Sequence, residues 1–229
     1  MSEKPHRTIK SFILRQGRLT HGQQRALDEQ WPVFGIDYEA QPLDLATLFG
    51  NDNPVVLEIG FGNGESLLQM AAENPEQNFI GIEVHRPGVG HLLHLIQEQG
   101  IQNLRVMNHD AIDILQNQIP EHSLSRIQLY FPDPWHKKKH NKRRIVQPAF
   151  LDTLASLLKE DGQIHFATDW EHYAEHMMAT LEAHAKFINT HKKQQFSPKP
   201  DYRPVTKFER RGQRLGHGVW DLIFKVCNK

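Results

Sequence analysis

The sequence contains a single cysteine, Cys227, among its 229 residues. One thiol can form neither an internal disulfide nor a thiolate metal cage, so both are excluded as structural devices. Long apolar runs are also missing, since none approaches the ~18 residues needed to cross a bilayer. The basic start of the chain is not followed by the apolar stretch of a signal peptide. These features predict a protein of the reducing cytoplasm that does not bind membranes.

Net charge is absent too, because 27 Lys and Arg balance 27 Asp and Glu. That balance alone argues against a nucleic-acid partner. The distribution reverses this interpretation: residues 1–27, 136–144 and 190–216 together carry 20 basic residues and 3 acidic ones, a net charge of +17. The remaining 166 residues carry −17. One charge run alone is compatible with a solvated face, but three basic segments on an acidic body predict binding to a polyanion.

The hydrophobic pattern becomes regular after residue 54, where short β-branched runs alternate with helical periods. Because parallel strands need crossover connections, this alternation predicts an α/β fold, a doubly wound, mostly parallel sheet with helices on both faces. Residues 1–50 are predicted to be a basic N-terminal arm and connector, and 51–229 a single domain. Seven strands are expected, at 55–59, 79–84, 104–107, 127–131, 164–167, 187–191 and 219–226. Helices are expected at about 65–73, 86–99, 111–118, 147–158 and 170–184.

An acidic residue lies at or just past the end of each of the first five predicted strands. Ligands of open α/β sheets bind outside these carboxyl ends. Any one such residue is equally well explained as a turn former, but five around one crevice favour a ligand with amines, hydroxyls or positive charge. The five residues are Glu58, Glu83, Asp110, Asp133 and Asp169.

The first of these strands runs into a glycine loop that contains Gly60, Gly62 and Gly64. Glycine lets the backbone turn tightly and approach a ligand closely. A dinucleotide-binding loop would place its third glycine at position 65, but that residue is Glu65. Both Glu65 and Glu58 would repel a pyrophosphate, which disfavours NAD. S-adenosylmethionine has an ammonium group, a sulfonium and a ribose, and no phosphate, so acidic surroundings suit it.

The acidic residues can be assigned to parts of this cofactor. Glu83 lies 19 residues past Gly64, where a carboxylate can accept hydrogen bonds from both ribose hydroxyls. Asp110 lies where it can accept from the adenine amino group, and Glu58 faces the methionine end. The alternative for Glu83 is a helix cap.

A rigid acidic turn follows the fourth predicted strand, with the sequence Phe-Pro-Asp-Pro-Trp at 131–135. Pro132 and Pro134 fix the backbone around Asp133 and remove two amide donors. Trp135 offers a face on which a base can stack. The basic run 136–144 follows at once, which an ordinary turn does not explain.

These motifs resemble those of the bacterial tRNA (guanine-N7)-methyltransferases, from about residue 50 to the end of the chain. The resemblance implies a Rossmann-like class I methyltransferase fold that transfers the methyl group of S-adenosylmethionine to N7 of guanosine 46, in the variable loop of tRNA. The segments that carry it are 58–64, 81–85, 131–144, 167–170 and 206–212.

The resemblance also assigns roles to individual residues. It makes Asp133 the catalytic residue. It also implies that Asp133, Glu58, Glu83 and Asp110 contact the cofactor, as do Gly60 and Gly62 of the glycine loop. Substrate contact is implied for Lys137, Asp169, Thr206, Lys207, Phe208 and Glu209. RNA contact is implied for Lys139, His140, Asn141, Lys142, Arg143 and Arg144.

Three alternatives compete with this assignment. The histidine pairs 136/140 and 172/176 have the spacing of metal ligands, but the first lies among lysines and neither has the glutamate of a zinc protease helix, so no metal is predicted. A methyltransferase acting on an exocyclic amine of rRNA or DNA, and an RNA-binding module without chemistry, remain as rivals. The sequence leaves open whether the protein is a monomer or a homodimer.

Overall fold

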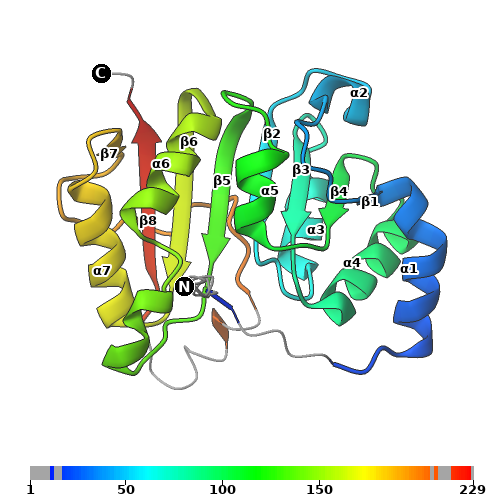
Figure 1. Cartoon of the computed structure of the whole chain (residues 1–229), viewed down its shortest axis with the longest axis horizontal. Coiled ribbons are helices and arrows are strands. Elements are labelled where there is room, and N and C mark those ends of the chain that lie inside the picture. The colour runs from blue at the N-terminus through cyan, green and yellow to red at the C-terminus, as the bar shows by residue number, and fades with distance from the viewer. Residues whose placement is uncertain (1–10, 13–16, 207–208, 211–217, 228–229) are drawn as a thin grey trace, which may run out of the picture.

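The computed structural model describes residues 11–12, 17–206, 209–210 and 218–227. These residues form an α/β fold around one sheet, whose strands run in the order β1-β4-β3-β2-β5-β6-β8-β7 (Figure 1). The strands are β1 (Gly35–Ile36), β2 (Val55–Ile59), β3 (Asn78–Ile82), β4 (Leu104–Met107), β5 (Leu124–Tyr130), β6 (Leu158–Thr168), β7 (Phe187–Asn189) and β8 (Trp220–Val226).

The first six strands are parallel, while β8 is antiparallel to both β6 and β7. The expected seven strands are all present, but the predicted number was wrong because the sheet has an eighth strand at its edge. This strand, β1, pairs Gly35 with Val106 and Ile36 with Met107. Two residues are too few to produce an alternating pattern, so β1 has no signal in the sequence.

Helices cover both faces of the sheet, as predicted. One apolar cluster joins it to α5 (Ala111–Asn117), α6 (Pro148–Leu157) and α7 (Glu171–Glu182). A second cluster joins the other face to α1 (His21–Phe34), α3 (Glu65–Glu73) and α4 (Arg86–Gln99). A short helix, α2 (Leu45–Phe49), precedes β2, and a 3-10 helix, η1 (Lys138–Arg143), follows β5. Because both faces are covered, the central strands β2 and β3 are buried throughout.

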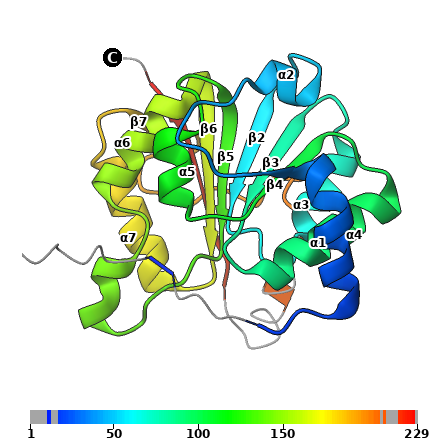
Figure 2. The ribbon, with the colours of Figure 1, turned by 45° about the vertical axis from the view of Figure 1, so that its right-hand side comes forward.

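The segment 1–50, expected to be an arm and connector, instead contains the helices α1 and α2 and the strand β1. Helix α1 packs along α4 (Figure 2) and buries Ala26, Leu27 and Phe34. Pro32, which argues against a helix, lies in its last turn. The helix start does have a sequence signal, because Thr20 and Gln23 form a capping box.

The strand order reverses direction at β2, since β3 and β4 lie on one side of it and β5 and β6 on the other. Ligands of such sheets bind at this switch point, outside the carboxyl ends of the strands. In Figure 1 these ends point downward. None of the described helices has the length and apolar character needed to cross a membrane.

Candidate active site

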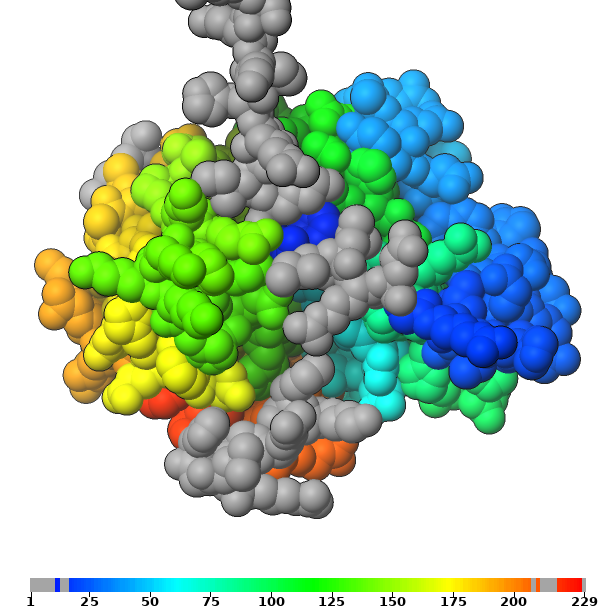
Figure 3. Space-filling model, turned by 60° about the horizontal axis from the view of Figure 1, so that its bottom comes forward, coloured from blue at the N-terminus to red at the C-terminus, as the bar shows by residue number. Residues whose placement is uncertain are grey.

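Five acidic residues line the carboxyl edge of the sheet, in the order of the strands that carry them. Asp110 follows β4, Glu83 follows β3, Glu58 lies within β2, Asp133 follows β5 and Asp169 follows β6. Neighbouring strands lie about 4.8 Å apart, so this row spans roughly 20 Å. The structure therefore brings together the five carboxylates that the sequence predicted to share a crevice. Figure 3 views this edge, with the segment after β5 in green on one side and α1 in blue on the other.

The glycine loop lies at the centre of this edge. Gly60, Gly62 and Gly64 have φ angles of 75°, 63° and 80°, a left-handed conformation that glycine adopts without strain. A Cβ added at Gly60 or Gly62 would meet no atom within 4 Å, so the loop faces open space there. A Cβ at Gly88, in the first turn of α4, would lie only 2.0 Å from the carbonyl oxygen of Gly62. Close packing of α4 thus supports the loop from behind.

Glu83 accepts hydrogen bonds from three backbone amides, one of which belongs to the glycine loop. Its Oε2 accepts a hydrogen bond from the Gly62 N–H at 2.8 Å, and its Oε1 accepts from the amides of Val84 and His85 at 2.7 and 2.9 Å. Three of the roughly four lone-pair sites of this carboxylate are therefore occupied, and the remaining one, on Oε2, can accept from a ligand hydroxyl. The alternative of a helix cap is wrong for Glu83, because the N-cap residue of α4 is His85 and α4 has no side-chain cap hydrogen bond.

Glu58 is a carboxyl group in a strand that is otherwise apolar. The residue is only 3% exposed, and its Oε2 has no hydrogen-bond partner among the residues that the structure describes. Burial, and next the charge of Glu83, raise the pKa of Glu58 to about 8, against the opposing effect of Arg126. A buried oxygen without a partner costs free energy unless a ligand donor satisfies it.

Asp110 stands at the start of α5 and accepts a hydrogen bond from the Ile112 amide at 3.1 Å, so it is the N-cap of that helix. The neighbouring Asn108 donates to the carbonyl oxygen of Glu83 at 2.7 Å. This bond ties the end of β4 to the end of β3 and holds Asp110 beside Glu83.

The turn after β5 has an unusual backbone. Phe131 and Trp135 have φ angles of 51° and 49°, on either side of the Pro132–Pro134 segment. Left-handed residues other than glycine cost about 1–3 kcal/mol each and cluster at functional sites. Asp133 lies between them and is exposed.

Trp135 contacts the N-terminal segment and two side chains of η1. Its indole N–H donates to the carbonyl oxygen of Ser11 at 3.1 Å, so the N-terminal segment reaches the turn after β5. The guanidinium of Arg143 lies 4.0 Å from the centre of the Trp135 ring, and His140 contacts the ring edge-on. A base could therefore stack on this face of Trp135 only by displacing Arg143.

The basic segment 136–144 divides into exposed and buried side chains. Lys137, Lys138, Lys139 and Lys142 are exposed. Arg144 is not: it is 2% exposed, donates to the carbonyl oxygen of Pro134 at 3.0 Å and pairs with His172 at 3.1 Å. The structure therefore contradicts a phosphate-contacting role for Arg144, which clamps the acidic turn to α7 instead.

The predicted substrate residues differ in their surroundings. Asp169 follows β6 beside Asp133, and Thr206 accepts a hydrogen bond from the Glu209 amide at 3.1 Å. Glu209 is 2% exposed and forms an ion pair with Arg203. Lys207 and Phe208 lie outside the described residues. The structure thus places the Glu209 carboxylate beneath the surface.

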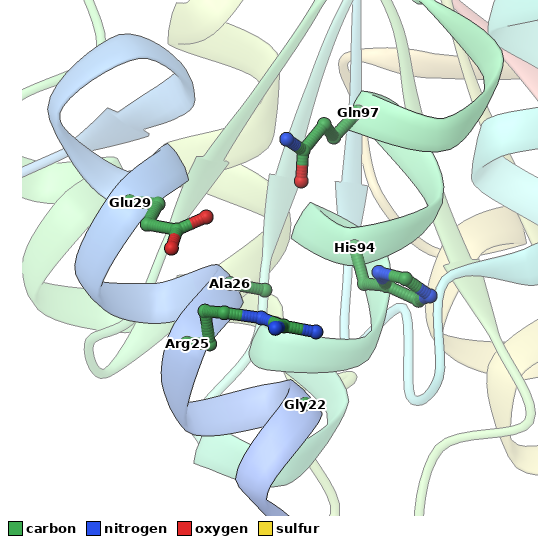
Figure 4. Close-up of a pocket in the computed structure, with 6 residues that line it drawn as sticks. All are labelled: Gly22, Arg25, Ala26, Glu29, His94 and Gln97. Atoms are coloured by element: carbon green, nitrogen blue, oxygen red, sulfur yellow. The ribbon is translucent and has the colours of Figure 1, made fainter.

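Two hollows lie elsewhere on the described surface and include none of the predicted site residues. One, of about 220 Å³, lies between α1 and α4 (Figure 4). The other, of about 560 Å³, lies on α7 beside Lys193 and Phe196. The histidine pair of α7 is also accounted for, because His172 bonds to Arg144 and His176 to the carbonyl oxygen of Val146.

Comparison with known proteins then decides the family. Residues 52–222 match the model of a family described as putative methyltransferases. A tRNA (guanine-N(7)-)-methyltransferase of Yersinia pseudotuberculosis is 59% identical over 96% of this chain and 92% of its own, and one of Aeromonas hydrophila is 59% identical over 97% and 94%. The chain belongs to the tRNA (guanine-N7)-methyltransferase family.

A solved structure of more distant sequence supports the methyltransferase fold. The 16S rRNA methyltransferase KamB superimposes with a TM-score of 0.60 at 13% identity, over 81% of this chain and 93% of its own. The fold is therefore that of class I methyltransferases, as the resemblance implied.

The cofactor of this methyltransferase is S-adenosylmethionine, and the site fits it. The unpartnered buried oxygen of Glu58 suits a cationic group. The open face of Gly60 and Gly62 leaves room for the ligand to approach the backbone. Glu83 and Asp110 would then hold the hydroxyl and amino groups farther along the edge.

Sequence reasoning missed a buried polar group behind the methyltransferase site, formed by Tyr130, His165, Tyr202, Arg203 and Asp221. The alternation of polar and apolar residues in β6 and β8 contained a weak signal of it. The position of Arg203 in a basic run instead predicted a side chain that binds RNA.

Proposed function

We propose that this methyltransferase methylates N7 of guanosine 46 in the variable loop of tRNA. The observation that carries the proposal is the position of Asp133, which lies between the left-handed residues Phe131 and Trp135, after the strand next to that of Glu58, and is followed by exposed lysines. The relatives named above act on guanine N7 of tRNA according to their names. Since tRNA is the substrate, we expect the protein to work in the cytoplasm.

Methyl transfer to guanine N7 requires alignment of the two reactants more than proton transfer. Guanine N7 carries a lone pair and no proton, so its attack on the methyl group requires no general base. The N7–carbon bond forms as the sulfur–carbon bond breaks, and the positive charge of the sulfonium passes to the guanine ring. Alignment of the two reactants supplies much of the rate.

Asp133 has two roles in this scheme. Its carboxylate accepts hydrogen bonds from the guanine N–H groups and stabilises the positive charge that develops on the ring. Asp169, on the neighbouring strand, holds another polar edge of the base, together with Lys137, Thr206 and Glu209 in the proposed substrate site. The exposed lysines after Lys137 bind the phosphates of the tRNA.

The test uses two tRNA transcripts that differ only at position 46, with guanosine in one and adenosine in the other. Labelled methyl transfer to the first and not to the second is the expected result. Equal transfer to both transcripts would overturn the assignment of position 46.

The variant Asp133→Ala tests the catalytic role. We expect turnover to fall at least a hundredfold, with tRNA binding within about threefold of wild type, because the carboxylate acts mainly in the transition state. Normal turnover with intact tRNA binding would rule this role out.

A further inference from the structure

The face of the sheet opposite α6 and α7 is covered, over β5, β6 and β8, by the chain segment that follows residue 195. Its Tyr202 ring lies 4.1 Å from the guanidinium of Arg126 on β5, and its hydroxyl lies 3.1 Å from Nδ1 of His165 on β6. In Figure 1 this orange segment runs behind the strands. The covering segment therefore contacts the sheet mainly through polar groups.

Arg203 is the centre of these contacts, and it is fully buried. Its Nε donates to Oδ1 of Asp221 at 2.7 Å and its Nη2 to Oδ2 at 3.0 Å, a bidentate pair with β8. Its Nη1 and Nη2 also donate to the two carboxylate oxygens of Glu209. One guanidinium thus binds two buried carboxylates at once, an arrangement that the planar fork of arginine allows and lysine does not.

Further groups fix Asp221 on the sheet. Nε2 of His165 lies 2.7 Å from Oδ1 of Asp221, and the hydroxyl oxygen of Tyr130 lies 2.9 Å from Nδ1 of the His165 ring. Burial lowers the pKa of His165, so the ring is neutral at physiological pH and its Nε2–H donates to Asp221. Asp221, one of the two partners of Arg203, is therefore held by β6 and β8, which are hydrogen-bonded neighbours in the sheet.

Arg203 also links the two halves of the proposed substrate site. Its guanidinium carbon lies 5.9 Å from the ring centre of Phe131, the left-handed residue that begins the turn of Asp133. On its other side it holds Glu209, whose amide donates to Thr206. The residue thus lies behind the site and contacts both parts that surround the proposed guanine position.

We propose that Arg203 is a positioning residue for methyl transfer: it fixes Thr206 and Glu209 against the Asp133 turn by joining the carboxylates of Glu209 and Asp221 beneath Phe131. This inference rests on the proposed contact of residues 206–209 with the substrate. Arg203 does not touch the substrate. Its basic side chain, which the sequence placed among the RNA-binding charges, is used within the protein.

The test compares the kinetics of Arg203→Gln and Arg203→Lys with those of wild type. We expect kcat/KM for tRNA to fall at least tenfold in Arg203→Gln and by a smaller factor in Arg203→Lys, which keeps the charge but loses the fork. The Kd for S-adenosylmethionine, measured by calorimetry, should stay within twofold. A merely structural role would weaken both ligands in parallel, and that result would overturn the proposal.

If the Arg203 variants do not fold, the variant Asp221→Asn tests the same proposal. It loosens the anchor on β8 while it leaves Arg203 and Glu209 in place. We expect amide hydrogen exchange in the peptide 203–210 to accelerate at least tenfold and kcat/KM for tRNA to fall, with S-adenosylmethionine binding unchanged. Unchanged exchange in this peptide would contradict the proposal.

Two further variants separate the possible failures. Lys225 lies on β8, the strand of Asp221, and its exposed side chain forms an ion pair with Asp161 on β6. Lys225→Met removes this pair and should leave the kinetics unchanged. Thr206→Ala tests the substrate segment itself. If Thr206→Ala raises KM for tRNA and the Arg203 and Asp221 variants do not, the positioning role is wrong. If Thr206→Ala has no effect either, the proposed substrate contact of 206–209 is wrong, and the inference fails with it.

Discussion

At the scale of single residues, Glu58 is the side chain whose chemistry depends most on its surroundings. Its raised pKa of about 8 means that it is mostly protonated at pH 7 in the free protein. A cationic ligand group beside its unpartnered oxygen would favour the ionised form. We therefore predict that S-adenosylmethionine binding at pH 7 releases a proton.

Calorimetry in buffers of different ionisation enthalpy measures this release. The apparent binding enthalpy should depend on the buffer for wild type and be independent of it for Glu58→Gln. Buffer independence in wild type would show that Glu58 does not change its protonation on binding.

The same side chain predicts a pH dependence of stability. Its pKa is about 8 in the folded protein and has its ordinary value near 4.5 in the unfolded chain. Only the unfolded chain loses this proton between these values, so the contribution of Glu58 to stability is complete below pH 4.5 and declines as the pH rises toward 8. The limiting slope is about 1.4 kcal/mol per pH unit.

Glu58→Gln should reduce this decline. The free energy of unfolding, measured in urea at pH 5 and pH 8, should fall less between these pH values in the variant, by at most about 4 kcal/mol. An identical fall in both proteins would show that Glu58 titrates normally in the fold.

At the scale of elements, the acidic turn after β5 depends on its connection to α7. Arg144 makes this connection by donating to Pro134 and pairing with His172. Arg144→Met leaves the Pro134 carbonyl without this donor, and should lower the free energy of unfolding by about 1–3 kcal/mol. Urea denaturation checks the value, with the exposed Lys159→Met as the control that should change little. Equal stability of the two variants would argue against the clamp.

The exposed lysines of η1 belong to the same scale. Each phosphate contact contributes roughly one unit to the slope of log K against log salt concentration. Lys139→Ala combined with Lys142→Ala should therefore reduce that slope for tRNA binding by about two. Lys159→Ala, at the opposite end of the sheet, should leave it unchanged. A slope unaffected by the double variant would place the RNA elsewhere.

The elements around the site were largely predictable from sequence, whereas some others were not. The strands next to the five carboxylates are short apolar runs, because both faces of the sheet are covered, and the helices between them have one apolar face. The two-residue β1 has no such pattern, and Pro32 concealed the last turns of α1. Arg203 escaped for another reason: its partners lie 6 and 18 residues away and meet it only through the tertiary fold.

At the scale of the whole molecule, function depends on a separation of charge. Carboxylates line the carboxyl edge of the sheet, where we propose that the methyl donor binds, and exposed basic side chains follow β5 at this edge. The separation accounts for a protein with no net charge that acts on a polyanion. It also explains why Arg144 and Arg203 can be buried, because many other basic residues remain in the three basic segments.

The rival reaction, methylation of an exocyclic amine, differs from N7 methylation in its product. A methyltransferase that acts on an exocyclic amine has to remove a proton, whereas N7 has none. In the rival case the methyl group appears on the guanine or adenine amino group. The products of the two reactions are therefore different nucleosides.

Mass analysis of tRNA nucleosides, after incubation with the protein and S-adenosylmethionine, tests the central claim most directly. The account predicts 7-methylguanosine in an amount that approaches one per accepting tRNA, and none with Asp133→Ala over the same period. A methylated exocyclic amine, or no methylated nucleoside at all with the wild-type protein, would contradict it.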